Sequence, residues 1–417
     1  MNSAIAATIG LCLAIFLVIR KLSPVYALFL GALVGGLLSG WGLSGTVDGM
    51  ISGVKDITPA IVRILAAGVL TGMLVRTGAA ERISLTIVNR LGSRLVFLAL
   101  ALSALVLTAT GVFIDVAVIT IAPIAILTGR RLGLSRGKLL LALIGGGKCG
   151  NIMSPNPNTI IAADNFGAPL PSVMGAGIIP AVIGLAVTVF VIVPLLPSGD
   201  RLEGSAEDMP QDRELPSFAA SISGPVVAII LLALRPLCGF AVDPMIALPV
   251  GGIVGIIATR SWKKTGDCLS YGLGKMSGIA VLLVGTGTLA GIIKASAIKD
   301  VLINLLSGWS NGAVFLAPIS GTLMCAASAS TTAGATIASA SFSSTILAAG
   351  VSAVWAAAMT NAGATVLDHL PHGSFFHATG GSVGMDVKDR LKLIPYESMV
   401  GLVLTVCTVA CYFIIGR

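Results

Sequence analysis

The sequence predicts an all-α polytopic membrane protein made of two inverted repeats, each with about five crossings, one re-entrant hairpin and a broken helix. Composition is the first observation. Of the 417 residues 55% are hydrophobic and only 11% are charged, whereas soluble proteins carry about 25% charged residues. The second observation is that apolar runs near the roughly 20 residues needed for one crossing recur from end to end. The third is that the two halves of the chain resemble one another.

The likeness between the halves is an internal repeat with an offset of about 220 residues. Residues 23–28 (SPVYAL) are followed by Gly31 and Gly35, and residues 243–248 (DPMIAL) are followed by Gly251 and Gly255. The tripeptide LTG that ends at Gly72 likewise corresponds to the LAG that ends at Gly291. The same structural unit therefore occurs twice.

The repeat divides the chain into two halves joined by a polar, acidic linker. The first repeat spans 1–197, the linker spans 198–221 and is expected in the cytoplasm, and the second repeat spans 222–417. Each repeat begins with scaffold spans and ends with a hairpin and a broken helix. The scaffold parts are about 1–92 and 222–308, and the hairpin parts are about 93–197 and 309–417.

The apolar run 95–128 is too long for one crossing and too short for two. As one helix its 34 residues would extend about 51 Å, against about 30 Å of hydrocarbon. Two crossings need roughly 40 residues and a turn. A re-entrant hairpin with its tip near 108–115 fits this length, and the run 312–344 predicts a second hairpin with its tip near 326–334. A single long tilted helix or a tight helical hairpin is the alternative.

The basic residues favour the inverted arrangement. Five crossings in each half, an odd number, place the second half upside down relative to the first. With the N-terminus outside, most of the 26 Lys and Arg residues fall in loops on the inner side, as the positive-inside rule requires. The net charge of +8 is thereby explained without nucleic-acid binding. No nucleotide-binding loop is present, which argues against a primary pump.

A first helix break is predicted over 145–158 (GGGKCGNIMSPNPN). Glycine is too free and proline lacks the N–H needed to continue a helix. Broken backbone at membrane depth is tolerated where it lines a cavity, and transporters build substrate sites this way. Lys148 in this stretch is a candidate partner for a carboxylate; the alternatives are that it pairs with Asp115 or snorkels.

A second break is predicted over 360–374, and it holds two of the chain's three histidines, with the third at 377. Histidine titrates near neutral pH, so His369 is a candidate for proton coupling, together with Asp368 and Asp115. Asp115 is the favoured carrier; a structural partner for Lys148 is its other possible role. A metal site formed by His369, His372 and Asp368 is the rival interpretation, although no H-E-x-x-H motif occurs.

Hydroxyl and amide side chains gather at both hairpin tips and both breaks. They can hydrogen-bond a polyhydroxylated solute or hold a cation; the alternative for each one alone is that it caps a helix. Together with Lys148 and His369, the predicted substrate-binding residues are Thr110, Asn151, Ser154, Asn156, Asn158, Ser330, Thr331 and Asn361.

Residues 147–159 (GKCGNIMSPNPNT) resemble the motif of the gluconate permease (GntP) family, and residues 113–116 (FIDV) resemble its aspartate-bearing hairpin segment. His369 matches the histidine of the family's S-H-V-N-D-S-G-F pattern, but residues 371–374 (PHGS) depart from it. The resemblance implies membership of a wider ion-transporter superfamily with inverted repeats, paired hairpins, dimers and elevator-like movement. It also implies uptake of gluconate and related hydroxy acids, or D-serine in one branch, typically with protons.

The sequence thus predicts a secondary transporter of the bacterial inner membrane that imports gluconate or a related small hydroxycarboxylate by proton symport. A sodium-coupled carboxylate carrier or a cation/proton antiporter of the same superfamily is the alternative. An intramembrane metalloenzyme is the alternative from another class. We expect a homodimer in contact with lipid, an organic anion and protons as ligands, and no cofactor, enzymatic activity or nucleic-acid partner.

Overall fold

The computed structural model describes residues 2–199, 201–202, 214–297, 312–371 and 373–416. Within these ranges the regular structure is helical, apart from one isolated bridge between Ser135 and Arg201. The prediction of an all-α membrane protein is confirmed. Most of the predicted linker, residue 200 and residues 203–213, lies outside the described ranges, so the division into repeats stays a prediction.

The helices follow one another along the chain with short connections. In the first half they are α1 (Ser3–Ile19), α2 (Pro24–Leu38), α3 (Gly42–Arg76), α4 (Ala79–Leu91), η1 (Ser93–Leu95), α5 (Val96–Ala109), α6 (Ile114–Leu132), α7 (Arg136–Asn151), α8 (Pro157–Phe166), α9 (Leu170–Val187), η2 (Thr188–Ile192) and α10 (Val193–Leu195). In the second half they are α11 (Phe218–Cys238), α12 (Pro244–Ala258), η3 (Trp262–Lys264), α13 (Thr265–Ala295), α15 (Gly312–Ser328), α16 (Thr331–Ala348), α17 (Ala353–Gly363), α18 (Ser374–Ser382), α19 (Val387–Leu391), α20 (Ile394–Cys411) and η4 (Tyr412–Gly416).

Four helical segments of the described chain are long and apolar enough to cross a membrane: Gly42–Arg76, Leu170–Leu195, Trp262–Ala295 and Val387–Gly416. A fifth crossing is possible if the bent pair α4 and η1–α5, which turns by 108°, counts as one span. Several other apolar helices, among them α1 and α2, have 10–17 residues, shorter than the roughly 20 that a perpendicular crossing needs. The number of crossings in each half therefore stays a prediction.

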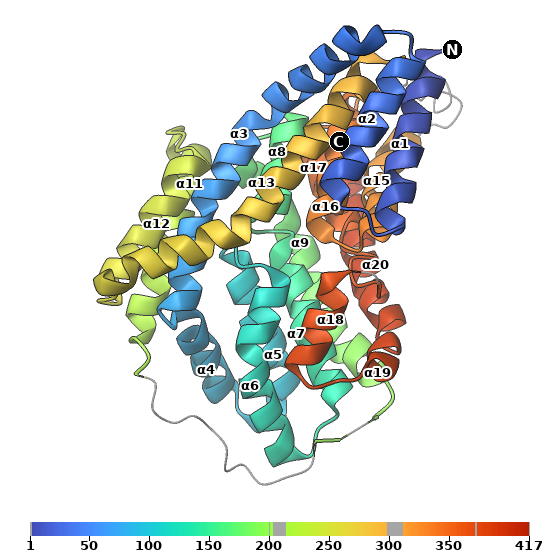
Figure 1. The fold of residues 1–417 in the computed structure, drawn as a ribbon. Coiled ribbons are helices and arrows are strands. Elements are labelled where there is room, and N and C mark those ends of the chain that lie inside the picture. The colour runs from blue at the N-terminus through green and yellow to red at the C-terminus, as the bar shows by residue number, and fades with distance from the viewer. Residues whose placement is uncertain (1, 200, 203–213, 298–311, 372, 417) are drawn as a thin grey trace.

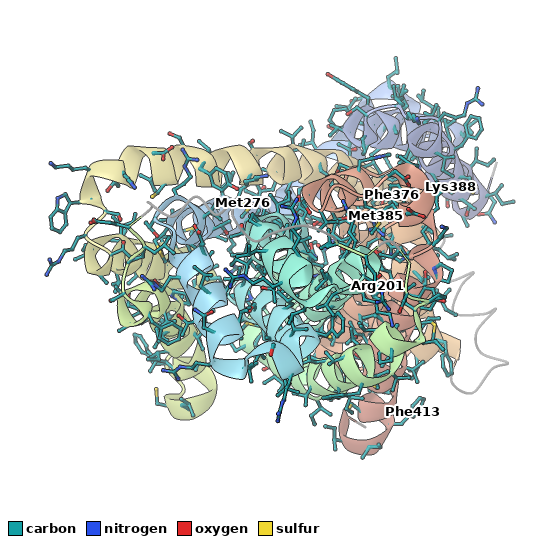
Figure 2. All side chains as sticks on the ribbon, turned by 90° about the horizontal axis from the view of Figure 1, so that it is seen from below. Arg201, Met276, Phe376, Met385, Lys388 and Phe413 are labelled. Atoms are coloured by element: carbon teal, nitrogen blue, oxygen red, sulfur yellow. The ribbon has the colours of Figure 1, made fainter. Side chains whose placement is uncertain are left out.

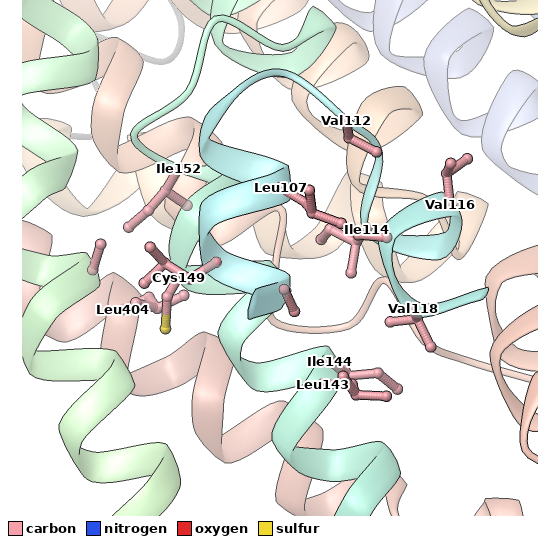
Figure 3. Packing of buried hydrophobic residues seen from close by; sticks show 14 of the residues in the cluster. Leu107, Val112, Ile114, Val116, Val118, Leu143, Ile144, Cys149, Ile152 and Leu404 are labelled. Carbon is pink, nitrogen blue, oxygen red and sulfur yellow. The ribbon is translucent and has the colours of Figure 1, made fainter. Parts of the chain in front are cut away.

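Both predicted hairpins are helix–turn–helix pairs and not single long helices. The first turn lies between Ala109 at the end of α5 and Ile114 at the start of α6, and the second between Ser328 at the end of α15 and Thr331 at the start of α16. Both turns fall inside the predicted tips. Figure 3 shows the first turn, where Leu107 and Ile114 belong to the buried apolar cluster.

The first helix break is narrower than the sequence suggested. We expected it over 145–158, but α7 continues to Asn151 and only residues 152–156 separate it from α8. The glycines of α7 serve close packing instead: a Cβ built on Gly146 would lie 1.9 Å from the carbonyl oxygen of Ala101 on α5, and one on Gly150 would lie 2.2 Å from that of Leu105. Lys148 is therefore held on a helix and not in the break.

The long helices α3 and α13 cross on one side of the molecule, with α11 and α12 beside one end of the pair and α1 and α2 beside the other (Figure 1). Small residues bring their backbones together. A Cβ on Gly53 would lie 2.0 Å from the carbonyl oxygen of Gly287, and a Cβ on Gly272 would lie 2.0 Å from that of Gly68. Met276, labelled in Figure 2, also contacts α3 beside Gly68.

These contacts are reciprocal at an offset of 219 residues. That offset carries Gly53 to Gly272 and Gly68 to Gly287, so the first contact becomes the second with the two repeats exchanged. Reciprocal contacts of this kind are what a two-fold relation between two similar units requires. We therefore propose that the two halves are arranged as inverted repeats around the crossing of α3 and α13.

This crossing leads to a stability prediction. Gly272→Ala should force α3 and α13 apart, because the added methyl group has no room beside Gly68, and overpacking of this kind costs about 1–3 kcal/mol. Gly278→Ala on the same helix meets nothing within 4 Å and should be neutral or slightly stabilising. Thermal unfolding of the two purified variants in detergent measures the difference. Equal unfolding temperatures would show that this crossing is not tightly packed.

Candidate functional site

A cavity of about 210 Å³ lies between the two hairpin tips and the two helix breaks. Its wall combines residues from both halves of the chain, and two of those from the second half lie on α13. They are Phe113, Ile114, Asp115, Asn151, Asn158, Lys275, Ile279, Ala329, Ser330, Thr331, Thr332, Asp368, Ser374 and Phe375. Of the predicted substrate-binding residues, Asn151, Asn158, Ser330 and Thr331 are in this wall.

Four helices begin at this cavity. The wall includes first-turn residues of α6 and α16 from the hairpins and of α8 and α18 from the broken helices. The first turn of a helix has unpaired N–H groups and carries a partial positive charge. Their convergence contributes a positive potential that favours an anion in the cavity.

Polar side chains in the wall are partly engaged with one another. Thr332 Oγ1 donates a hydrogen bond of 2.6 Å to Asn158 Oδ1, which joins the second hairpin to α8. Ser330 Oγ accepts from the N–H of Ala333, which leaves its own hydrogen to donate. The Nδ2 group of Asn151 is buried and has no acceptor among the described residues. An unpaired buried donor is unfavourable, so Asn151 favours a ligand with an acceptor atom.

Three charged residues line the cavity. Asp115 in the first turn of α6 is half-buried, and Asp368 in the second break is buried. Lys275 on α13 is exposed and forms no ion pair within the described part of the chain. The sequence analysis did not identify Lys275 as a site residue. Its position directly before the apolar run 276–293 was the available sign that it lies on a membrane helix.

Lys148 is not in the cavity wall. Its side chain is fully buried, and Nζ forms an ion pair of 2.7 Å with Asp368 Oδ1. The same ammonium donates to the carbonyl oxygen of Thr365 at 2.6 Å and contacts His369 Nδ1 at 3.0 Å. The partner of Lys148 is therefore Asp368 and not Asp115, the alternative suggested by the sequence.

His369 lies behind Asp368, also without exposure to solvent. Its Nδ1 is 3.0 Å from Asp368 Oδ1, and its Nε2 is 3.0 Å from the carbonyl oxygen of Ile394 and 3.1 Å from Ser398 Oγ. The sequence placed Asp368 and His369 together as candidates for proton coupling. The structure shows that they belong to one hydrogen-bonded group with Lys148.

A second buried ion pair, which the sequence analysis did not identify, completes this group. The guanidinium of Arg390 on α19 donates to both carboxylate oxygens of Glu397 on α20, and Glu397 Oε2 lies 3.9 Å from His369 Nδ1. The guanidinium of Arg390 lies over the ring of Phe376, with 4.9 Å between the guanidinium carbon and the ring centroid. The available sign was an acidic residue inside the last apolar run, 396–415, because ionisable residues at membrane depth are rarely without a role.

The remaining predicted residues stabilise the turns and breaks. Thr110 Oγ1 donates to the carbonyl oxygen of Leu107 in the first turn. Asn156 caps α8 and donates to Ser154 Oγ at 2.7 Å. Asn361 Nδ2 donates to Thr159 Oγ1 at 3.1 Å and so joins the two broken helices.

Among the described residues no group of three or more His, Cys, Asp or Glu side chains is arranged so that it could hold a metal ion. His377 Nε2 lies 2.8 Å from the carbonyl oxygen of Pro371. His372 falls outside the described ranges.

The buried pair predicts a difference in stability. Lys148→Ala leaves the Asp368 carboxylate buried without its partner and should cost about 3–5 kcal/mol. Lys294→Ala removes one partner of the exposed pair with Asp56 and should cost less than about 1 kcal/mol. Thermal unfolding measures both. Neutralising the buried pair together, as Lys148→Met with Asp368→Asn, should recover most of the loss; a double variant no more stable than Lys148→Ala would contradict this account.

Comparison with known proteins places this site in a transporter. The sequence model described as "GntP family permease" matches residues 3–416. The chain is 54% identical to an uncharacterised transporter of Haemophilus influenzae over 97% of this chain and 96% of that protein. It is 24% identical to a gluconate permease of Pseudomonas aeruginosa over 79% and 78% of the two chains.

The fold resembles a solved transporter structure. The crystal structure of the Alcanivorax borkumensis YdaH transporter, described as having an unusual topology, superposes with a TM-score of 0.62. It covers 90% of this chain and 89% of that chain at 15% sequence identity, so the likeness concerns the fold. Because the family model matches nearly every residue, this multi-pass membrane protein is a transporter and not an enzyme, and the chain belongs to the GntP family of permeases.

Proposed function

We propose that this permease imports a small hydroxycarboxylate, gluconate or a close relative, together with protons across the bacterial inner membrane. The cavity between the hairpin tips is the observation that supports the proposal. It is smaller than the roughly 300–1,000 Å³ of sites for drug-sized ligands, as suits a solute of a few carbon atoms. Its wall combines features for a carboxylate with features for hydroxyl groups.

The carboxylate of the solute would interact with Lys275 and the converging helix N-termini. Lys275 supplies a positive charge and forms no ion pair with an acidic residue of the described chain. The N-termini supply unpaired N–H groups, which are good donors to carboxylate oxygens. Asn151 and Ser330 would donate to the hydroxyl oxygens of the solute. A helix can be broken at membrane depth where its unpaired backbone groups line a cavity instead of facing lipid. The broken helices can therefore present these N–H groups to a bound solute.

Proton coupling requires a titratable group whose charge changes during the cycle. Asp115 and Asp368 in the cavity wall and His369 behind it are the candidates. Binding of a proton near the site favours binding of an anion, and the reverse holds equally. Sodium coupling is the competing proposal, and the uptake experiment distinguishes it.

We further propose that the hairpins and broken helices move against a static scaffold of α1–α4 and α11–α13 in a homodimer. Among the described residues, Arg63 on α3 marks the boundary between these parts. Its guanidinium forms one ion pair with Asp164 on α8 and another of 2.6 Å with Asp243 at the start of α12. The first pair crosses the proposed boundary, whereas the second stays within the scaffold.

Uptake into proteoliposomes tests the function directly. Radiolabelled gluconate should accumulate under an inward proton gradient in sodium-free medium, because symport draws its energy from that gradient. Lys275→Gln should weaken apparent affinity about tenfold or more, since it removes the cation of the site, while Lys263→Gln on the exposed η3 segment should not. Accumulation that follows a sodium gradient at constant pH would support the sodium-coupled carrier. No transport of gluconate, L-idonate or D-serine under either gradient would refute the proposal.

Crosslinking tests the movement. In a background without the native cysteines, Arg63→Cys with Asp164→Cys joined by a short bis-maleimide should stop uptake, because the bond ties the moving part to the scaffold. Arg63→Cys with Asp243→Cys, joined in the same way, should leave the crosslinker without effect, since both positions lie in the scaffold. The readout is uptake before and after crosslinking in each variant. If both crosslinks inhibit equally, the boundary is wrongly placed.

A further inference from the structure

We infer that His369 is the group that takes up the coupled proton, and that Glu397 and Arg390 set the charge balance which makes that proton necessary for anion binding. The inference rests on the proposed function, uptake of an anion with a proton. It concerns a buried cluster defined by Lys148, Asp368, His369, Glu397 and Arg390, each at most 1% exposed. Asp368 is its one member in the cavity wall.

The contacts of His369 favour one tautomer of the neutral ring. The carbonyl oxygen of Ile394, 3.0 Å from Nε2, can only accept a hydrogen bond, and the ammonium of Lys148, 3.0 Å from Nδ1, can only donate one. We therefore assign the hydrogen of the neutral ring to Nε2, which leaves Nδ1 as an acceptor facing Lys148. The same Nδ1 lies 3.0 Å from Asp368 Oδ1, so in the neutral ring two acceptors face each other. A proton on Nδ1 turns this contact into a hydrogen bond to a carboxylate.

Lys148 is placed to accommodate both states of the histidine. Four acceptors surround its three N–H groups: the carbonyl oxygen of Thr365 at 2.6 Å, Asp368 Oδ1 at 2.7 Å, His369 Nδ1 at 3.0 Å and the carbonyl oxygen of Glu397 at 3.3 Å. When Nδ1 binds a proton it stops accepting, and three acceptors remain for three donors. The proton can therefore enter and leave without leaving an N–H of Lys148 unpaired. The protonated ring then lies against the ammonium of Lys148, and Asp368 Oδ1, which contacts both groups, offsets the repulsion between these two cations.

The charges of the cluster explain why proton and anion would bind together. With a neutral histidine, two cations (Lys148 and Arg390) and two anions (Asp368 and Glu397) cancel. The buried thiols of Cys149 and Cys325 add no charge at neutral pH in their ordinary protonated form. A proton on His369 leaves the cluster with a charge of +1, and an anion in the adjacent cavity offsets it. Because uncompensated charge is unfavourable at low dielectric constant, each ligand increases the affinity of the other.

The cluster also contacts the second hairpin. Asp368 uses Oδ1 for Lys148 and His369, and its Oδ2 accepts a hydrogen bond of 2.7 Å from Thr331 Oγ1 at the start of α16. Thr331 itself lines the cavity. One carboxylate thus connects the proton site to the hairpin tip that contacts the solute. Asp115, the carrier favoured by the sequence, lies across the cavity and has no described contact with this cluster.

Proton uptake on ligand binding tests the inference. Gluconate is added to purified permease in weakly buffered detergent solution at a pH where His369 is neutral, and a pH indicator reports the protons absorbed for each gluconate bound. We expect about one proton for the unmodified protein and for the exposed-surface control Asp389→Asn, and none for His369→Gln. Apparent Kd for gluconate should rise about tenfold per pH unit in the unmodified protein, as linkage to one proton requires.

Glu397→Gln provides an independent test of the charge balance if His369→Gln does not fold. Removing the Glu397 charge leaves the cluster at +1 with a neutral histidine. Gluconate should then bind without proton uptake, with a pH-independent Kd that matches the Kd of the unmodified protein at low pH. Arg390→Gln shifts the charge the other way and should weaken gluconate binding at every pH. Thermal unfolding and gel filtration check that each variant is folded.

Three outcomes would overturn the inference. One is full proton uptake in folded His369→Gln with none in Asp115→Asn, which would assign the proton to Asp115. Another is unchanged pH dependence in folded Glu397→Gln. The third is gluconate binding by the unmodified protein without proton uptake. A protein that binds no gluconate, L-idonate or D-serine at any pH would instead refute the proposed function, and the inference with it.

Discussion

The buried ion pair between Lys148 and Asp368 joins the last turns of α7 to the second helix break, and the arrangement of the cavity depends on it. Lys148 lies near the end of α7 in the first half, and Asp368 lies between α17 and α18 in the second. Both side chains are buried in the protein interior, and an unpaired charge there is strongly unfavourable. Because Asp368 also binds Thr331 at the tip of the second hairpin, one carboxylate positions three of the segments that form the cavity.

Glycine serves two purposes in this fold. Between membrane helices there is little hydrophobic gain, so close contact of backbones and van der Waals packing must supply the attraction. Gly53 and Gly272 allow this where α3 and α13 cross, and Gly146 allows it between α7 and α5. Gly373, at the end of the second break, also leaves no room for a Cβ, which would lie 2.4 Å from the carbonyl oxygen of Ala329. A glycine in a membrane sequence thus indicates close approach as often as a break.

These two roles of glycine show which features of the structure can be predicted from the sequence and which cannot. The helical class and the two turns were predictable because they rest on composition and on lengths, which local sequence determines. The extent of the first break was not predictable, because a glycine such as Gly146 is equally compatible with a helix break and with a closely packed helix. Nor was the pairing of Lys148 with Asp368, because residues 220 positions apart meet only through tertiary packing. Lys275 and Glu397 could have been identified from the sequence, because both are charged residues at the edge of an apolar run.

The balance of buried charge bears on how a carrier of this kind would avoid leaking protons. On the proposed mechanism, the empty cluster is neutral, and the cluster with both a proton and an anion is neutral as well. The proton alone leaves +1 and the anion alone leaves −1. Moving a net charge through a medium of low dielectric constant costs several kcal/mol, so the two half-loaded forms would cross rarely. Strict coupling then needs no separate gate, because the charges of Glu397 and Arg390 already penalise each half-loaded form.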